Sequence, residues 1–362
     1  MTTVADSLRA HLLAAACDDR SLRVWGQGVV TDPKRIFGTL PSPAEMPTDH
    51  GRQPGLVETP NSEAAVLGAA VGAAMAGQRT VVVYQRVEFA LLAMNAIVNQ
   101  AAKVAWLSGG KLRCPLVLRM IIGRGWGQGP THGQSFEATW AGIPGLKVVM
   151  PGRPEDMGPL LYASIMDGGP VVFLEHRWLH GLPVPDDSVC RTYKLEAGPR
   201  LVSGPAKARI TIVGTGYMTV EAGRAGQVLA ADGIAAEVWD MSVLMPINPG
   251  PLVASVATTG RLLFVDTGPC IYGIGSTVNS LVAQGAWRFL KAPPGAIGCS
   301  FEPLPSSPRL AADYYPTPRT IAVEALRLLG TTLTEHGEKV LGRMEEEPTD
   351  LPPKQSSFGG PF

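Results

Sequence analysis

An acidic residue at the start of a helix rich in small residues is the first group that could do acid–base chemistry. The stretch TPNSEAAVLGAAVGAAMAG predicts a helix over 62–77 in which Asn61 or Ser62 caps the first turn and Glu63 lies within that turn. A carboxylate there is stabilised by the helix dipole, and it can also exchange a proton with a ligand. First-turn acids are common, so the pattern leaves a catalytic and a structural role open. The alanines and glycines of the helix suit close packing against another backbone.

A histidine in a glycine-rich loop is the second candidate. The segment GRGWGQGPTHGQSFEATW (123–140) places His132 after four alternating glycines. Such loops at the carboxyl ends of strands are where open α/β sheets bind ligands. The glycines match neither the dinucleotide-binding pattern nor the P-loop pattern, so the loop is only a weak phosphate motif. His132 is therefore a candidate ligand contact, with a purely structural role as the alternative.

Other reaction classes find little support. The sequence contains no GxSxG or HExxH motif, and its five scattered cysteines, Cys17, Cys114, Cys190, Cys270 and Cys299, include no CxxC pair. This cysteine usage predicts a reducing compartment rather than a disulfide framework or a zinc site. The 31 basic and 31 acidic side chains cancel, so the net charge favours neither nucleic acid nor a membrane as a partner. No apolar run is long enough for a membrane helix and no basic leader begins the chain, so we expect a cytoplasmic protein.

The elements that must position these residues follow an α/β pattern. Short β-branched runs alternate with helical patterns along most of the 362 residues. The first half predicts strands at 80–85, 115–120, 147–151 and 170–175, and helices at 62–77, 89–107 and 154–167. A second alternation ends in a helix near 317–330. We expect two doubly wound open-sheet domains.

A stretch without periodicity separates the two alternations. Residues 183–208 contain several turn residues and no sustained apolar pattern, which is typical of a linker. From about 331 the chain is charged and then proline-rich, which predicts an extended or docked tail rather than a third domain. The expected organisation is a first domain (1–190), a linker (191–207), a second domain (208–330) and a tail (331–362).

Two long runs resemble the β subunits of thiamine-diphosphate-dependent 2-oxo acid dehydrogenase E1 components, the enzymes for pyruvate, branched-chain oxo acids and acetoin. The runs are VETPNSEAAVLGAAVGAAMAGQRTVVVYQRVEFALLAMNAIVNQAAKVAWLSGG and THGQSFEATWAGIPGLKVVMPGRPEDMGPLLYASIMDGGPVVFLE. The later segments ITIVGTG, WDMSVLMPINP and GRLLFVDTG are similar more loosely. The resemblance covers about residues 20–330. It implies a transketolase-like pyrimidine-binding domain followed by a transketolase C-terminal domain.

The resemblance also implies a role for each candidate residue. Glu63 matches the glutamate that hydrogen-bonds N1′ of the cofactor aminopyrimidine, through which the cofactor acts as its own acid–base catalyst. Phe89 matches the aromatic residue that stacks on the pyrimidine. His132 matches a histidine near the thiazolium that can contact the carboxylate of a 2-oxo acid. Arg86 and Glu88, which lie beside Phe89 in the sequence, are expected on position alone to shape the same pocket.

In this family the cofactor lies between two chains. An α chain holds the diphosphate and Mg²⁺ through a GDG…NN motif, and we find no such motif in this sequence. The resemblance therefore implies an α₂β₂ heterotetramer in which thiamine diphosphate and Mg²⁺ are anchored mostly by the α subunit. Several family members also bind a structural potassium ion through backbone carbonyls, and the matching positions are Leu116, Ser164, Asp167 and Gly169.

Several departures set the chain apart from the usual family pattern. Gln27 stands near the position of a glutamate in the proton path between the two active sites, and a neutral amide cannot relay a proton as a carboxylic acid does. Asn95 and Ala96 replace an aspartate–glutamine pair, and HGQ replaces HSQ at 132–134. The departures leave the substrate open and predict altered communication between the sites.

The leading interpretation is an oxidoreductase component, an E1 β subunit active only with its α subunit. A 2-oxo acid would be decarboxylated and its acyl unit passed to the lipoyl domain of an acyltransferase. A second interpretation is the β half of a split transketolase-like ketol or acyl transferase in specialised metabolism, which works without lipoamide. A third is a non-catalytic partner of an α chain, against which the presence of Glu63, Phe89 and His132 argues.

Overall fold

The chain forms two compact units. The computed structural model describes residues 2–47, 55–125, 127–185 and 189–346. Unit 1 takes its described residues from 1–122, 139–196 and 243–246, and unit 2 takes its own from 123–138, 197–242 and 247–362. One of the passages between the units follows Glu196, inside the expected linker, whereas residues 243–246, expected in the second domain, group with unit 1. The loop 123–138, which the sequence assigned to the first domain, groups with unit 2.

Unit 1 is built on a seven-stranded sheet. Its strands are β1 (Arg23–Gly26), β2 (Leu56–Glu58), β3 (Thr80–Tyr84), β4 (Leu116–Ile122), β5 (Lys147–Val149), β6 (Val171–His176) and β10 (Val243–Met245). They are arranged in the order β10-β5-β6-β4-β3-β1-β2, and only β10 is antiparallel to its neighbour. Every residue of β3, β4 and β6 is buried, as continuous apolar runs predict for central parallel strands.

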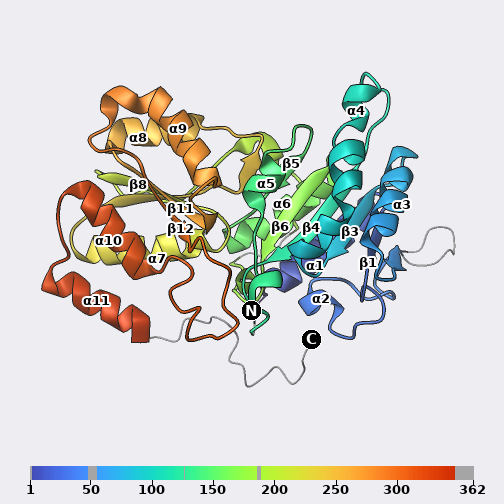
Figure 1. Ribbon diagram of the computed structural model, residues 1–362, viewed down its shortest axis with the longest axis horizontal. Coiled ribbons are helices and arrows are strands. Elements are labelled where there is room, and N and C mark those ends of the chain that lie inside the picture. The colour runs from blue at the N-terminus through green and yellow to red at the C-terminus, as the bar shows by residue number, and fades with distance from the viewer. Residues whose placement is uncertain (1, 48–54, 126, 186–188, 347–362) are drawn as a thin grey trace. The chain divides into compact units, whose positions relative to one another are not determined.

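Several helical segments pack on one another or on the sheet of unit 1 (Figure 1). The segments of the first half of the chain are α1 (Val4–Asp18), α2 (Arg35–Gly38), α3 (Glu63–Met75), η1 (Val87–Ala93), η2 (Ala96–Ala101), α4 (Val104–Leu107), η3 (Gly129–Thr131), α5 (Glu137–Ala141), α6 (Pro154–Met166), η4 (Arg177–Leu179) and η5 (Leu195–Ala197). Helix α1 packs on α6, and α3 packs against β3, η1 and η2. Helix α3 therefore lies against η1, the segment that carries Phe89.

The sequence pattern predicts one continuous helix over 89–107, and this prediction is wrong. The chain there forms η1, η2 and α4, and η1 is bent by 70° from the segment that follows it. The backbone N–H of Ala102 donates to the carbonyl of Ile97, five residues earlier, at 3.0 Å, so the turns of η2 are wider than those of an α-helix. The wider turns keep Ala96, Ile97 and Ala101 on the buried side.

No single helix in the described ranges is long and apolar enough to cross a membrane. The bent pair formed by η1 and the segment Ala96–Leu107 passes the same test of length and composition.

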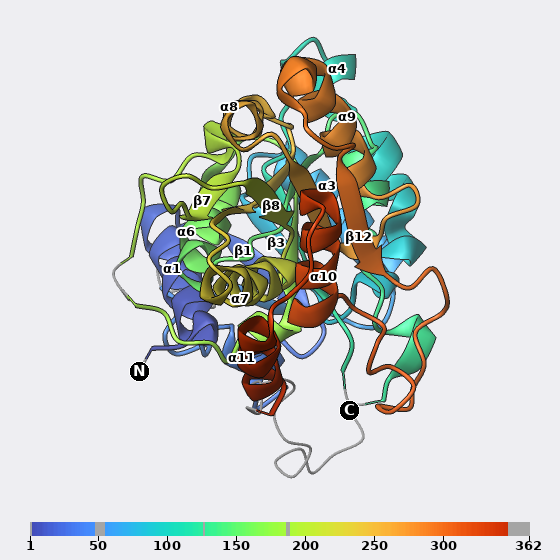
Figure 2. The same ribbon diagram turned by 90° about the vertical axis from the view of Figure 1, so that its left-hand side faces the viewer.

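Unit 2 contains a five-stranded sheet. Its strands are β7 (Arg200–Ser203), β8 (Ile210–Gly214), β9 (Ala236–Asp240), β11 (Leu262–Pro269) and β12 (Gly295–Cys299), and its helical segments after the linker are α7 (Met218–Ala231), α8 (Gly250–Thr259), α9 (Ile274–Ala286), η6 (Trp287–Phe289), α10 (Pro318–Leu329) and α11 (Glu335–Glu346). The strand order is β12-β11-β8-β9-β7, with only β7 antiparallel. Helices α10 and α11 both pack on α7 (Figures 1 and 2).

Two segments expected to be irregular are ordered. Strand β7 lies inside the expected linker and pairs with the sheet edge, but most of its side chains are exposed, so it carries no apolar alternation. Helix α11 lies in the expected tail, where Leu341 is buried. The backbone N–H and hydroxyl of Thr334 donate to the Asp232 carboxylate at 2.8 and 2.5 Å, which ties the start of α11 to the end of α7. Residues 347–362 of the expected tail lie outside the described residues.

The interior of unit 1 contains an ion pair of opposite charges. Arg119 in β4 and Glu175 in β6 are fully buried and joined by two hydrogen bonds, of which Arg119 Nη2 to Glu175 Oε2 measures 2.8 Å. His180 Nε2 lies 3.1 Å from the same oxygen. Burial opposes ionisation of Glu175, but the Arg119 charge and the His180 hydrogen bond hold the pKa of Glu175 below its ordinary value. Each charge therefore depends on the other.

We predict that Arg119→Met destabilises the chain by about 3–5 kcal/mol, because it leaves the buried Glu175 charge without its main partner. The double variant Arg119→Met, Glu175→Gln should recover much of this loss, because no full charge then remains buried. Urea unfolding of both variants tests the prediction. It fails if the double variant is as unstable as the single one.

The interior of unit 2 contains two carboxyl groups that interact closely. Glu137 begins α5, Asp266 lies in β11, and both are buried. A Cβ added to Gly268 would collide with Glu137 Oε1, so the β11 backbone approaches this carboxyl closely. Burial raises the pKa of Glu137, and burial together with the Glu137 charge raises the pKa of Asp266. Since two adjacent buried carboxylates repel each other, the pair is expected to retain a proton at a pH where an isolated carboxyl group would be ionised.

This pair predicts a stability that falls as pH rises. The folded chain keeps a proton that the unfolded chain loses above about pH 4, so the free energy of unfolding decreases by up to about 1.4 kcal/mol per pH unit until the folded pKa is passed. Glu137→Gln should flatten this dependence, whereas the exposed control Glu335→Gln should not. Urea midpoints between pH 5 and 8 measure it, and equal slopes in wild type and Glu137→Gln contradict the prediction.

Candidate functional site

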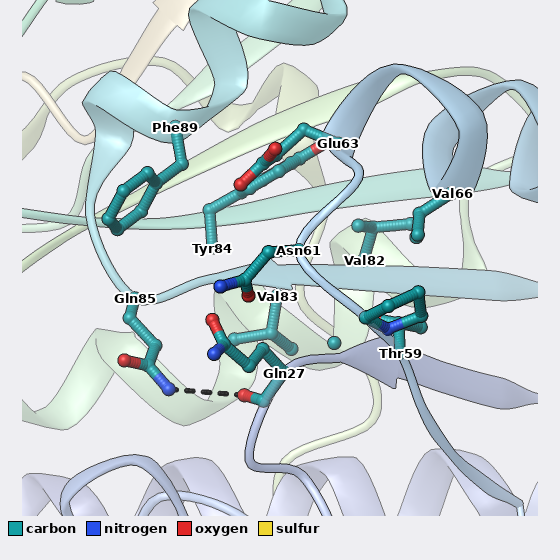
Figure 3. A pocket seen from close by; sticks show the side chains of 12 residues that line it. Gln27, Thr59, Asn61, Glu63, Val66, Val82, Val83, Tyr84, Gln85 and Phe89 are labelled. Atoms are coloured by element: carbon teal, nitrogen blue, oxygen red, sulfur yellow. Dashed lines mark hydrogen bonds between the residues drawn. The ribbon is translucent and has the colours of Figure 1, made fainter.

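A pocket lies in unit 1 at the carboxyl ends of β1 and β3 (Figure 3). Its walls come from the end of β1, the segment that joins β2 to α3, strand β3 with the residues after it, and η1. The empty space amounts to about 400 Å³, part of it open to solvent. Loops at the carboxyl ends of parallel strands are the usual ligand-binding region of open α/β sheets.

Two of the predicted site residues face each other across this pocket. Glu63 is the first residue of α3, Phe89 belongs to η1, and both are half-buried and line the pocket. In Figure 3 the Phe89 ring and the Glu63 carboxylate point into the same space from neighbouring helical segments. Glu63 forms no hydrogen bond or ion pair with any residue that the structure describes. Its carboxylate is therefore available to a ligand.

Neutral amides form another part of the lining. Gln27, Asn61 and Gln85 all border the pocket, and Gln85 Nε2 donates to the backbone carbonyl of Gln27 at 3.1 Å (Figure 3). Gln27, singled out as a departure from the family pattern, is thus a residue of the pocket itself. These amides offer donors and acceptors without adding charge.

Glu58, which sequence reasoning did not single out, holds the loop that presents Gln27. Its carboxylate accepts hydrogen bonds from the backbone N–H groups of Gly28, Val30 and Thr31 at 2.5, 2.7 and 3.1 Å. Desolvation opposes ionisation of Glu58, but these N–H groups outweigh it and lower the pKa of Glu58. The only sequence signal is an acidic residue at the end of a short strand, which is too common to identify such an anchor.

Tyr84 is a second pocket residue that sequence reasoning missed. It is the last residue of β3. Its place at the end of an apolar run predicts only a position in the core. In the fold its side chain lines the pocket with Glu63. Its hydroxyl group is buried and has no hydrogen-bond partner among the described residues.

The other predicted residues lie elsewhere. Arg86 is buried and Glu88 is half-buried, and neither is part of the pocket lining. The Arg86 charge instead affects another arginine: burial and the repulsion from Arg86 together lower the pKa of Arg177 to about 9. His132 belongs to unit 2, where its Nδ1 lies 3.1 Å from the Thr131 hydroxyl.

The turn expected to bind potassium already holds two cationic side chains. Arg79 Nη1 donates to the backbone carbonyl of Asp167 at 2.9 Å and also to that of Ile165. Lys147 Nζ lies 2.6 Å from the Asp167 carboxylate. Of the remaining predicted positions, Leu116 is a buried residue of β4, Ser164 Oγ donates to the Leu160 carbonyl, and Gly169 N–H donates to the Asp167 carboxylate.

Among the four predicted positions, these cationic contacts involve Asp167, and the potassium site stays a prediction. In the described ranges, no cluster of three or more His, Cys, Asp or Glu side chains could hold a metal ion.

Comparison with known families accounts for most of the chain. Residues 12–181 match the family described as transketolase, pyrimidine binding domain, and residues 202–321 match the family described as transketolase, C-terminal domain. The first match contains the whole pocket lining, including Glu63 and Phe89.

Curated relatives share about a third of their residues with this chain. The acetoin:2,6-dichlorophenolindophenol oxidoreductase subunit beta of Cupriavidus necator is 34% identical over 308 residues, which cover 84% of this chain and 89% of the relative. The protein of the same name from Bacillus subtilis is 32% identical over 91% of this chain and 97% of its own. The pyruvate dehydrogenase E1 component subunit beta of Rickettsia bellii is 35% identical over 69% of this chain and 76% of its own.

A solved structure supports the fold. The chain titled split gene transketolase, inactive beta4 tetramer, superimposes with a TM-score of 0.69, covering 90% of this chain and 98% of that chain at 20% identity. The expected transketolase-like fold is confirmed. This chain therefore belongs to the thiamine-diphosphate-dependent, transketolase-like family that includes the β subunits of acetoin-oxidising enzymes and of pyruvate dehydrogenase E1.

Proposed function

We propose that this chain is the β subunit of a 2-oxo acid dehydrogenase E1 component and is active with an α subunit. One observation carries the proposal. The Glu63 carboxylate, which has no partner in the described chain, faces a pocket that also presents the Phe89 ring. The names of the relatives, E1 and acetoin-oxidising β subunits, support the same function.

The pocket suits the aminopyrimidine ring of thiamine diphosphate. Phe89 offers an aromatic face for stacking, and Glu63 offers a carboxylate that can share a proton with a ring nitrogen. Gln27, Asn61 and Gln85 can bond the exocyclic amine and exclude water without adding charge. When bound, the cofactor supplies the nucleophile and the electron sink that decarboxylation of a 2-oxo acid requires.

The exposed face of α3 supports the presence of a partner chain. Ala65, Ala69 and Gly72 are exposed, and a Cβ added to Gly68 or Gly72 would meet nothing within 4 Å. The small residues are therefore not required by packing within this chain, and they allow another backbone to approach closely. We propose that the α subunit covers this face and the adjoining pocket in an α₂β₂ assembly and anchors the diphosphate and Mg²⁺.

His132 completes the proposal on the substrate side. An imidazole in a glycine-rich loop can donate a hydrogen bond to the carboxylate of a 2-oxo acid. The loop belongs to unit 2, so this role requires the loop to reach the pocket of this or another chain in the assembly.

We predict that Glu63→Gln, assembled with the α subunit, slows exchange of the cofactor C2 proton by about 10²–10⁴-fold, because an amide cannot exchange the proton that a carboxyl group shares. Exchange into deuterated water, followed by NMR after acid quench, measures this rate. Glu155→Gln is a matched control, since Glu155 also lies in the first turn of a helix, α6, but outside the pocket. Wild-type exchange in a correctly assembled Glu63→Gln complex would remove Glu63 from the mechanism.

A purified lipoyl domain separates the two enzymatic interpretations. With a 2-oxo acid as donor, the assembled protein should acylate the lipoyl group, which mass spectrometry detects as a mass increase on the domain. Acyl or ketol transfer to an aldehyde, without any acylation of the lipoyl domain, would instead identify a split transketolase-like transferase. Pyruvate, branched-chain oxo acids and acetoin should be compared as donors, since the sequence leaves the substrate open.

A further inference from the structure

Tyr84 presents an unsatisfied polar group beside the Glu63 carboxylate. The residue is 6% exposed, and its side chain forms part of the pocket wall. Among the described residues, nothing forms a hydrogen bond with its hydroxyl oxygen. Burying a hydroxyl without a partner is costly, and such groups are rare in folded proteins. A phenylalanine would fill the same space without this cost, so the hydroxyl calls for an explanation outside the isolated fold.

Glu63 is the complementary group. Its carboxylate accepts no hydrogen bond from the described chain, although it lies at the start of α3 above the same pocket. In Figure 3 the Tyr84 ring extends from β3 toward Glu63. Burial is the main cause that raises the pKa of Tyr84, and the negative charge of Glu63 raises this pKa further. The second effect means that the two groups interact electrostatically. An unused donor and an unused acceptor therefore border one pocket.

We propose that Tyr84 is a positioning residue for Glu63. When a partner chain covers the pocket, the Tyr84 hydroxyl donates a hydrogen bond to one carboxylate oxygen of Glu63 and leaves the other oxygen to face the bound ring. Covering the pocket removes water, which otherwise solvates the half-buried carboxylate, and hydrogen bonds to a carboxylate strengthen in such surroundings. The inference rests on the proposed function, because it assigns Glu63 to a bound aminopyrimidine.

Tyr84→Phe removes only the hydroxyl and keeps the ring that forms the pocket wall. Because the hydroxyl has no partner among the described residues, the urea midpoint of the free full-length chain should stay the same or rise. Tyr162→Phe is a matched control, since the Tyr162 hydroxyl donates to Asp18 Oδ2 at 2.8 Å away from the pocket. That variant should lower the midpoint and leave binding at the pocket unchanged. A lowered midpoint for Tyr84→Phe would make the hydroxyl structural and overturn the proposal.

A double-mutant cycle tests the link to Glu63. The dissociation constant of thiamine diphosphate, with Mg²⁺ present, is measured by calorimetry on the assembled complex for wild type, Tyr84→Phe, Glu63→Ala and the double variant. Tyr84→Phe should weaken binding about tenfold when Glu63 is present, the effect of losing one charge-assisted hydrogen bond. It should weaken binding less than about twofold in the Glu63→Ala background, because the two residues act as a unit.

The outcomes separate this inference from the proposed function. An equal effect of Tyr84→Phe in both backgrounds would place the hydroxyl on the ligand itself and overturn the positioning role. No effect in either background would overturn it as well. If Glu63→Gln slows C2-proton exchange while Tyr84→Phe leaves affinity unchanged, only the role of Tyr84 fails. If Glu63→Gln leaves exchange unchanged, the proposed function fails.

Discussion

The carboxyl edge of the parallel sheet in unit 1 is the constraint on which the site depends. Parallel strands end at one edge, so the residues after β1 and β3 and the helix that follows β2 meet there, although they are far apart in sequence. Glu63 enters the pocket because α3 begins at this edge, and Phe89 enters because η1 packs against α3. The sheet thereby brings together an acidic side chain and an aromatic ring that are not neighbours in the sequence.

The polar groups of the pocket differ from the buried ion pair of unit 1. Arg119 and Glu175 are fully buried and bind each other, so this pair satisfies its own charges. At the pocket, by contrast, the Glu63 carboxylate and the Tyr84 hydroxyl are without partners in the described chain. An unsatisfied donor and an unsatisfied acceptor that border one pocket are expected where binding supplies the missing partners. These two groups are the physical reason for our proposal that the pocket is half of a shared site.

Much of this organisation can be predicted from the sequence because its signals are local. The apolar runs of β3, β4 and β6 and the place of Glu63 in the first turn of α3 follow from local patterns. The expected cap is not formed, because the Ser62 side chain makes no capping hydrogen bond. Glu63 and Phe89 were predicted from their place in family motifs, and the fold brings both to one pocket. Strand β7 and helix α11 escaped prediction because pairing at a sheet edge and docking on α7 stabilise them, and neither leaves a clear pattern in the sequence.

The sequence by itself determined the α/β class, the two alternations of strands and helices, and the residue types available for chemistry. Only the tertiary structure decided which of those residues share a pocket. It placed Arg86 in the interior rather than at the pocket. It also brought Glu58 to the loop that presents Gln27, and Tyr84 to the pocket wall that it shares with Glu63. The physical reason is that a hydrogen bond or a burial environment depends on neighbours distant in the chain, and no local pattern records them.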